Sequence, residues 1–383
     1  MGRLIWSRNI PAPYEGLVAS RPRMLTARDT TNKQAMSRYA VFASEALTSI
    51  KVVFSNFDLS TGTDSGVGAA NVGTASIEYP AGTFTALRSG GSTALTTPDG
   101  GLLFCDYLSV NIPAGATFWI RQYITNTNGI VYLDRVNATL GDAATFGVSG
   151  VADQTLGGTV SSSGSVVVPP IAIIGQTINA SVIVVGDSIG FGTDSNGDPN
   201  GVTFNSYGNG LITPSLGSVP FLNLSWPSQT AQNWISKSPA RKLLVPYGSH
   251  LIQQLSTNDI IAARSQAAIV ADLQAIYALA RVGQKVFQTT STPHATSSDA
   301  FATTGNQTAL ELAARTTFNN AVRAIISGST GYFDTASALE TAQNSDIWKA
   351  SPAPPYTNDG LHPVQAGYDL VKNSGVIGPI TYP

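Results

Sequence analysis

Cysteine, histidine and charged side chains are scarce in this sequence of 383 residues. The single cysteine, Cys105, cannot form a disulfide within the chain, and no Cys/His cluster indicates a metal site. Charged residues make up 11% of the chain and the net charge is −2, so neither nucleic acid nor an anionic membrane is an implied partner. No apolar run reaches membrane-spanning length. We therefore expect no metal, no cofactor, no nucleic-acid partner and no membrane span.

The N-terminal segment and the overall composition indicate different locations for the protein. Residues 1–8 lack the apolar core of a secretory signal. Low charge and abundant Ser, Thr, Gly and Asn are instead typical of an extracellular or virion surface. A phage particle protein, or a trimmed chain, would agree with both observations. We expect an extracellular or virion-associated protein, and the sequence does not indicate its oligomeric state.

The length of the chain favours two domains. Residues 1–45 contain three prolines with little periodicity and are expected to form an irregular N-terminal arm. Between residues 46 and 178, short apolar or alternating runs are separated by turn signals such as Pro80-Ala-Gly82, and this spacing predicts an all-β sandwich or jelly roll. The strands predicted in that region span residues 50–57, 75–79, 83–87, 107–112, 117–124 and 130–136.

Residues 179–383 alternate strand patterns with helix patterns. Apolar runs at 181–185, 251–255 and 285–290 have strand length, whereas 262–282 and 307–327 carry apolar residues at helical spacing. Strands that alternate with helices imply a parallel sheet with helices on both faces. This part of the chain is therefore predicted to be an α/β domain.

The apolar run 181–185 ends abruptly in Gly186-Asp187-Ser188. A β-branched run of this kind is typical of a strand buried on both faces, and open α/β sheets bind ligands at the carboxyl ends of their strands. Gly186 and Gly190 permit a tight turn that would present the serine there. An ordinary strand-to-loop turn would give the same pattern, so this stretch indicates a nucleophile only in combination with others.

Two later stretches supply possible partners for Ser188. In Asp359-Gly-Leu-His362, Asp359 could accept the Nδ1 proton of His362 and leave Nε2 free as a base. The alternative is that His362 only caps or packs, although it is the one of three histidines beside a carboxylate at this spacing. Asn258 follows a second apolar strand, where its amide could donate to an oxyanion or cap the next helix.

With these stretches the sequence resembles the SGNH (GDSL) hydrolase family over about residues 180–383. Gly186-Asp187-Ser188, Ser256-Thr-Asn258-Asp259 and Asp359-Gly-Leu-His362 are similar to three blocks of that family and follow its order. The resemblance implies an SGNH-type three-layer α/β/α catalytic domain over residues 179–383. It also implies that Ser188 is the nucleophile, His362 the base and Asp359 its partner.

The same resemblance implies an oxyanion hole made by the N–H groups of Ser188 and Ser228 and the amide of Asn258. Ser228 stands where the family has a glycine, and Ser256 replaces a second glycine. The backbone N–H survives the replacement of glycine by serine if φ is negative at that position. The letters Gly186-x-Ser188-x-Gly190 also match the nucleophile elbow of α/β-hydrolases. That fold is disfavoured because no His-Gly-Gly-Gly run precedes the serine and its acid usually lies far from its histidine.

We expect a serine esterase that hydrolyses O-acyl esters, most of all O-acetyl esters, on a carbohydrate or polysaccharide. The low charge and the predicted β-domain favour this substrate, the latter by analogy of fold alone. A lipase or thioesterase is the alternative within the family. A non-catalytic polysaccharide-binding or virion structural protein with a degenerate hydrolase domain is the alternative outside it. Possible substrate contacts are Trp226, Trp348 and Tyr356, with core packing as the alternative, and His294, which lies in a loop at the carboxyl end of a predicted strand.

Overall fold

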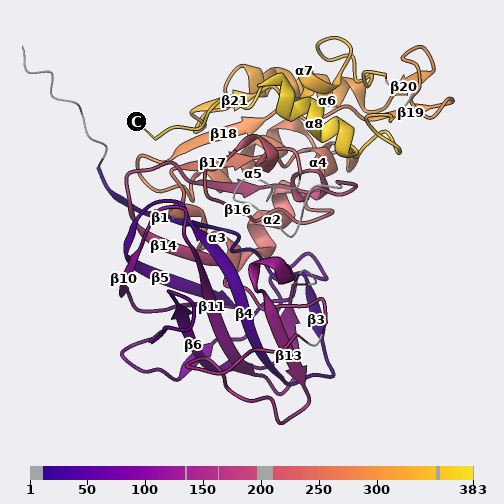
Figure 1. The fold of residues 1–383 in the computed structure, drawn as a ribbon. Coiled ribbons are helices and arrows are strands. Elements are labelled where there is room, and N and C mark those ends of the chain that lie inside the picture. The colour runs from indigo at the N-terminus through magenta and orange to yellow at the C-terminus, as the bar shows by residue number, and fades with distance from the viewer. Residues whose placement is uncertain (1–11, 134–135, 163, 196–209, 351–353, 383) are drawn as a thin grey trace, which may run out of the picture.

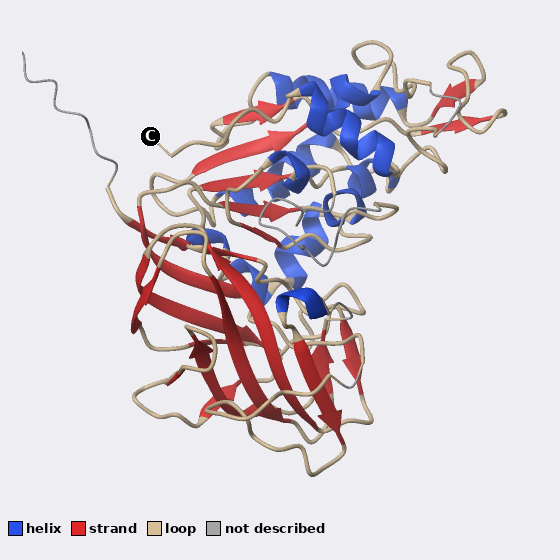
Figure 2. Cartoon of the chain, viewed as in Figure 1, coloured by secondary structure: helices blue, strands red, loops and turns tan. Residues whose placement is uncertain are grey.

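The computed structural model describes residues 12–133, 136–162, 164–195, 210–350 and 354–382. Antiparallel sheets form the N-terminal part, and a parallel sheet with helices forms the C-terminal part (Figures 1 and 2). Within these ranges, none of the helices has the length and apolar character needed to cross a membrane.

Two antiparallel sheets account for most of the N-terminal part. The first has the strand order β1-β14-β5-β10 with β9 also on β5, and the second has the order β13-β4-β11-β6-β7 with β2 on β4 and β8 on β6. A separate pair is formed by β3 and β12. The strands are β1 Tyr14–Leu17, β2 Ala19–Ser20, β3 Ala27–Asp29, β4 Gln34–Ala43, β5 Leu47–Ser55, β6 Asn71–Glu78, β7 Phe84–Ala86, β8 Leu95–Thr97, β9 Leu102–Phe104, β10 Leu108–Ile112, β11 Thr117–Thr125, β12 Ile130–Tyr132, β13 Ala143–Gly147 and β14 Ala172–Thr177.

The two sheets enclose a common apolar core. Ile50 and Val52 of β5 pack there with Phe118 and Ile120 of β11, which belongs to the other sheet. Val53 points to the opposite face of β5 and belongs to a second core shared with the C-terminal part. The predicted β-rich region is therefore confirmed, whereas the jelly-roll order and the domain boundaries stay predictions.

Residues 1–45 do not form the irregular arm that was expected, where the structure describes them. Strands β1 to β4 occupy much of this segment, and β4 pairs with both β11 and β13. The sequence obscured β4 because its ten residues are buried almost throughout, so no alternation of polar and apolar side chains marks it. Residues 1–11 lie outside the described ranges.

The C-terminal part is built on a parallel sheet of order β16-β15-β17-β18-β21. The chain leaves β15 for β16 on one side and returns to β17 on the other side. This reversal creates a topological switch point at the carboxyl end of β15, which is where open α/β sheets bind ligands. The strands are β15 Val182–Val185, β16 Phe221–Asn223, β17 His250–Gln253, β18 Lys285–Thr289 and β21 Gly331–Phe333.

Helices cover both faces of this sheet. Ile183 and Val185 of β15 share a core with residues of α2, α5 and α6, whereas Val182 and Val184 point to a core formed with α7 and α8. The three layers follow from the apolar character of both faces of β15. The helices are α1 Ser188–Phe191, α2 Ala231–Lys237, α3 Pro239–Lys242, α4 Thr257–Ile261, α5 Gln266–Tyr277, α6 Leu312–Arg323, α7 Thr335–Leu339 and α8 Gln365–Ser374.

The helix predicted over residues 307–327 is wrong at its N-terminal end. Gln307–Ala309 forms strand β20, which pairs with β19 at Ala295–Ser297, and α6 begins only at Leu312. Glu311, immediately before α6, has a φ of 45°, a left-handed conformation that no regular helix continues through. Pairing with the preceding strand β19 therefore overrides the local helical pattern.

Candidate active site

Ser188 follows the carboxyl end of β15 and begins the short helix α1. Asp187 precedes it as the N-cap, and its carboxylate accepts the Ile189 N–H at 2.9 Å. The side-chain oxygen of Gln254 accepts the N–H groups of both Asp187 and Gly190, each at 3.0 Å. These bonds fix a tight turn that leaves the Ser188 side chain half-buried at the edge of the sheet.

The loop before α8 carries His362 and is held by its own carboxylate. Asp359 accepts hydrogen bonds from the N–H groups of Leu361 and His362, both at 2.8 Å. Gly360 follows Asp359 with a φ of 78°, and a Cβ there would come within 1.7 Å of the Ala295 carbonyl oxygen. The close packing on Ala295 therefore requires glycine in this turn.

The structure brings Ser188, His362 and Asp359 together, although 174 residues separate the first two. The hydroxyl of Ser188 lies 2.8 Å from Nε2 of His362, and Nδ1 of His362 lies 2.7 Å from a carboxylate oxygen of Asp359. When Nδ1 carries a proton and donates a hydrogen bond to Asp359, Nε2 can accept the hydroxyl proton of Ser188. The geometry therefore suits activation of a serine by a base that a carboxylate orients.

Burial and hydrogen bonding act on Asp359 in opposite directions. Partial burial tends to raise the pKa of Asp359, but the hydrogen bonds from the side chain and N–H of His362 and from the Leu361 N–H outweigh it and lower the pKa. The group is therefore ionised at neutral pH. An ionised carboxylate at Nδ1 stabilises the positive charge that His362 acquires when it takes up a proton.

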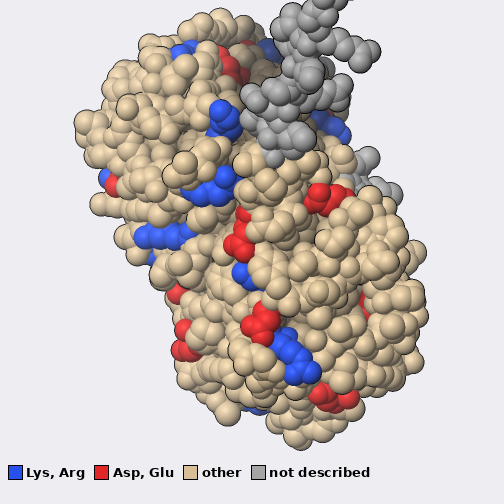
Figure 3. Space-filling view, turned by 90° about the vertical axis from the view of Figure 1, so that its left-hand side faces the viewer, with Lys and Arg blue, Asp and Glu red and all other residues tan. Residues whose placement is uncertain are grey.

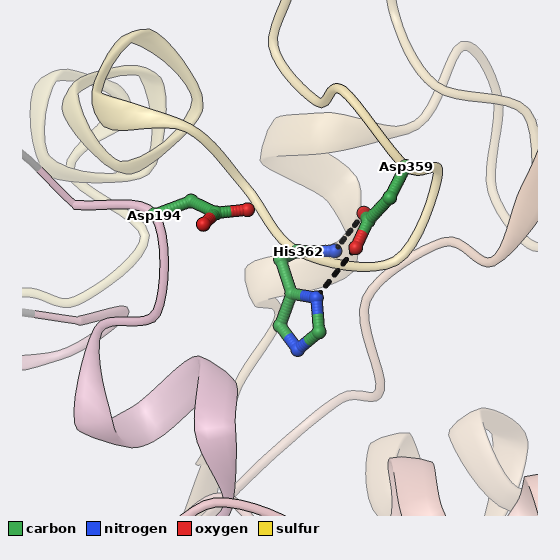
Figure 4. Close-up of side chains that lie close together, drawn as sticks. All are labelled: Asp194, Asp359 and His362. Carbon is green, nitrogen blue, oxygen red and sulfur yellow. Dashed lines mark hydrogen bonds and ion pairs between the residues drawn. The ribbon is translucent and has the colours of Figure 1, made fainter.

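A second carboxylate lies beside the same histidine. Side-chain ligand atoms of Asp194, Asp359 and His362 lie within 4.8 Å of one another, and Asp194 stands on the opposite side of His362 from Asp359 (Figure 4). Among the described residues, this is a group whose composition suits a metal ion. Two of its three members, however, are already bonded to each other, and His362 is also bonded to Ser188.

The loop after β16 contains Ser228, whose backbone has a φ of 62°. The condition of a negative φ, under which serine would replace the glycine without strain, is therefore not met. The left-handed conformation, which costs a serine about 1–2 kcal/mol, is the one that glycine adopts freely. Ser228 is exposed and retains its N–H, so the substitution for glycine introduces strain without removing the donor.

Asn258, in the first turn of α4, is connected to the same loop. Its side-chain amide donates to the Gln229 carbonyl at 3.0 Å, which engages one of its two amide hydrogens. The Trp226 N–H donates to the Gly186 carbonyl at 3.1 Å. The loops after β15, β16 and β17, which carry Ser188, Ser228 and Asn258, are thus tied together at one edge of the sheet.

Ser256 occupies the other position where a serine replaces a glycine of the family. It is fully buried, and its φ of 168° is extended backbone that any residue adopts. The following Asp259 accepts the Ala231 N–H at the start of α2 and pairs with Arg264. Asp259 therefore orders the loop around Asn258 and connects it to the neighbouring helix.

No family model and no curated protein matches the sequence. Several solved structures are similar to it. A member of the lipolytic G-D-S-L family from Veillonella parvula is 16% identical, with a TM-score of 0.32, over 52% of this chain and 97% of that one. Phospholipase A1 from Streptomyces albidoflavus is 19% identical, with a TM-score of 0.31, over 51% and 99%. A salicylyl-acyltransferase from a tetracycline biosynthetic pathway is 10% identical, with a TM-score of 0.33, over 91% and 81%.

The chain is similar to structures of the GDSL family. The Veillonella parvula structure bears the name of the family that the sequence blocks resemble. At these TM-scores the matches assign no role to any residue, and the roles proposed for this GDSL-like chain rest on its own contacts.

Four residues were predicted as possible substrate contacts, and Trp348 cannot serve as one. Its side chain is completely buried, and its ring N–H donates to the Gly360 carbonyl at 2.9 Å. Trp348 therefore supports the loop between Asp359 and His362 from behind. Large aromatic side chains are mostly buried. The position of Trp348 near His362 in the sequence therefore could not show whether it lines the site or packs beneath it.

The other three predicted contacts retain partial exposure. Trp226 packs edge-on against Phe191 of α1, so it stands next to the segment that carries Ser188. His294 bonds through Nδ1 to Glu311 at 2.6 Å. Tyr356 packs partly into the core below α8. Their contact with substrate stays a prediction.

Sequence reasoning missed Gln254 and the segment around Gly62. Gln254 is almost fully buried and joins the turns on both sides of Ser188, although no motif marks it. A signal was present in its position, because a long amide directly after a buried apolar strand needs hydrogen-bond partners. Gly62 belongs to the N-terminal part, and nothing in the sequence connects it with the loops of the parallel sheet.

Proposed function

We propose that this protein is a serine esterase in which Ser188, His362 and Asp359 act as a triad. The observation that carries the proposal is the continuous hydrogen-bonded series from Ser188 through His362 to Asp359, at 2.8 and 2.7 Å. Its position at the switch point of a parallel sheet supports the same conclusion.

The reaction proceeds through an acyl-enzyme. Oγ of Ser188 attacks the ester carbonyl carbon while its proton passes to Nε2 of His362. The carbonyl oxygen becomes an oxyanion, which the N–H groups of Ser188 and Ser228 and the amide of Asn258 stabilise. Collapse of this intermediate expels the alcohol, which takes the proton from His362. Water then repeats the sequence and releases the acid.

The proposed substrate is an O-acetyl ester on a carbohydrate. Only 11% of the residues are charged, and most of the side chains on the face drawn in Figure 3 are uncharged, a composition that suits a neutral polymer as substrate. An extracellular or virion-associated location is part of the same proposal. Longer acyl chains would be the substrates of a lipase or thioesterase.

Hydrolysis of p-nitrophenyl acetate by wild type and Ser188→Ala tests the enzymatic proposal. We expect turnover by wild type and a loss of about 10⁴-fold or more in the variant, with the fold retained by circular dichroism. Equal rates for the two proteins would instead favour a non-catalytic binding or structural protein.

A panel of esters separates the substrate classes. We expect acetyl esters to be cleaved faster than decanoyl esters and acyl thioesters, and acetate to be released from acetylated polysaccharides. Faster cleavage of the decanoyl ester would contradict the proposed carbohydrate esterase and favour a lipase.

A further inference from the structure

The segment Leu59–Asp64, which we call the β5–β6 loop segment, belongs to the N-terminal part but contacts the loops of the parallel sheet. A bridge between Asp58 and Ser65 closes its base, and the Gly62 N–H bonds to the Leu59 carbonyl at 2.7 Å. Leu59 is fully buried in the core shared with α2 and α3. The tip of this segment is therefore held rigidly against the C-terminal part.

Asp64 fixes the segment to α3. Its carboxylate accepts the N–H groups of Ala240 and Arg241 at 3.0 and 2.8 Å and pairs with the Arg241 side chain at 2.6 Å. Both side chains are fully buried. In the other direction, the Asp64 N–H donates to the Lys237 carbonyl at the end of α2. Asp64 thus supplies from a distant part of the chain the N-terminal cap that Ser238 does not provide.

Gly62 reaches the loop proposed to hold the oxyanion. Its carbonyl accepts the side-chain amide of Gln229 at 2.8 Å, and Gln229 is almost fully buried. Gln229 directly follows the strained Ser228, and its own carbonyl accepts the amide of Asn258. A single residue thus connects Gly62 with both proposed oxyanion donors of the loops after β16 and β17.

A side chain at Gly62 would displace the Gln229 amide from its present position. A Cβ there would lie 2.8 Å from the Gln229 amide nitrogen and 4.0 Å from the Trp226 ring, and φ is 72°. The segment therefore borders the same Trp226 that stands beside α1.

We infer that Gly62, Asp64 and Gln229 are positioning residues that hold the Ser228 N–H and the Asn258 amide for the oxyanion. This inference rests on the proposed function and makes the N-terminal part a component of the acyl-transfer site rather than a separate attachment. The left-handed backbone at Ser228 needs such support, because a strained turn persists only where its surroundings over-determine it.

Gln229→Met tests the inference, because methionine keeps the length of the side chain but cannot donate to Gly62. We expect kcat per active site, titrated with a fluorophosphonate, to fall about 10- to 100-fold, with KM changed less than about threefold. Affinity for a trifluoromethyl ketone, whose adduct carries an oxyanion, falls in proportion to kcat/KM. Gly62→Ala changes both quantities in the same direction.

Tyr14→Phe is the matched control. Tyr14 also joins the two parts by a buried hydrogen bond, at 2.9 Å to the Ser181 hydroxyl, but at the amino end of β15. We expect this variant to melt earlier with unchanged kcat per site. An unchanged kcat in Gln229→Met, or an equal fall of kcat in Tyr14→Phe, overturns the inference. The proposed function still stands in that case, because wild type remains active. Absence of both turnover and Ser188 labelling in wild type refutes the proposed function itself, and the inference with it.

Discussion

Ser228 shows that a residue can depart from a family pattern and still keep the group that the chemistry needs. The oxyanion would be held by the backbone N–H, which serine and glycine share. What differs is the conformation, since φ is 62° at this position. The two serines that replace glycines therefore have different consequences, because Ser256 has an extended backbone with no such strain.

Ser228→Gly is expected to raise the free energy of unfolding by roughly 0.5 kcal/mol. The relief of about 1–2 kcal/mol of strain exceeds the entropic cost of about 0.5–1 kcal/mol that glycine brings. Activity is retained because the N–H remains. Urea unfolding and kcat measure the two quantities, with Ser228→Val as a control that should lose stability. A less stable glycine variant would contradict this account.

Asn258→Ala is expected to lower kcat by about 10²- to 10³-fold with little change in KM, since an oxyanion donor acts mainly in the transition state. Steady-state kinetics on p-nitrophenyl acetate measure it. Asn258 also bonds to Gln229, so a thermal melt should accompany the assay. Full activity in the alanine variant would remove Asn258 from the site.

Asp187 gives stability a defined pH dependence. Complete burial raises the pKa of Asp187 from 3.8 to about 6, with His362 and Asp259 as the charged groups that act on it and Tyr368 also nearby. A raised pKa means that the folded protein favours the protonated form. The contribution of Asp187 to stability is therefore fully present below pH 4 and is lost as pH rises through about 6.

Asp187→Asn is expected to remove this loss. The free energy of unfolding of the variant minus that of wild type should be larger at pH 8 than at pH 4, by up to about 3 kcal/mol. Urea denaturation at both pH values measures the difference. A constant difference between the two proteins across this range would show that Asp187 titrates normally.

Among the elements, the turn from β15 into α1 depends on a residue of another strand. Gln254, just after β17, accepts two N–H groups that flank Ser188. A helix of four residues has too few internal hydrogen bonds to hold that turn by itself.

Gln254→Leu is expected to lower the free energy of unfolding by about 2–4 kcal/mol, because two buried N–H groups lose their acceptor. The same change should reduce kcat, since the position of Ser188 shifts. Gln254→Glu keeps the acceptor oxygen and should lose less of both. Unfolding curves and kcat would contradict the assignment if leucine and glutamate behaved alike.

The elements also show what local patterns could and could not predict. The strands β15, β17 and β18 and the position of Ser188 followed from apolar runs, because a strand buried on both faces leaves a clear pattern. The helix expected from residue 307 failed because β20 pairs with β19, a contact that periodicity does not contain. Likewise, Gln229 and Gly62 meet across 167 residues, and no local signal could have paired them.

At the scale of the whole molecule, the N-terminal and C-terminal parts share one apolar core. Phe57 and Leu59 pack there with Leu224 and Trp234, and α2 and α3 lie between the two parts in Figure 1. A fragment of residues 179–383 would expose this surface.

We expect that fragment to lack a cooperative thermal transition and to bind a hydrophobic dye, because separation returns the shared core to water. Circular dichroism and dye fluorescence measure this, with the full chain as control. A fragment that melts as sharply and as high as the full chain would contradict the dependence.

The pairing of β1 with β14 has a consequence for the order of events during synthesis. Strand β1 ends at Leu17, yet its hydrogen-bonding partner β14 begins only at Ala172. An unpaired strand edge invites association with other chains until then. The nascent chain must therefore carry β1 without its partner until β14 has been synthesised, and Ser188 follows soon after that pairing becomes possible.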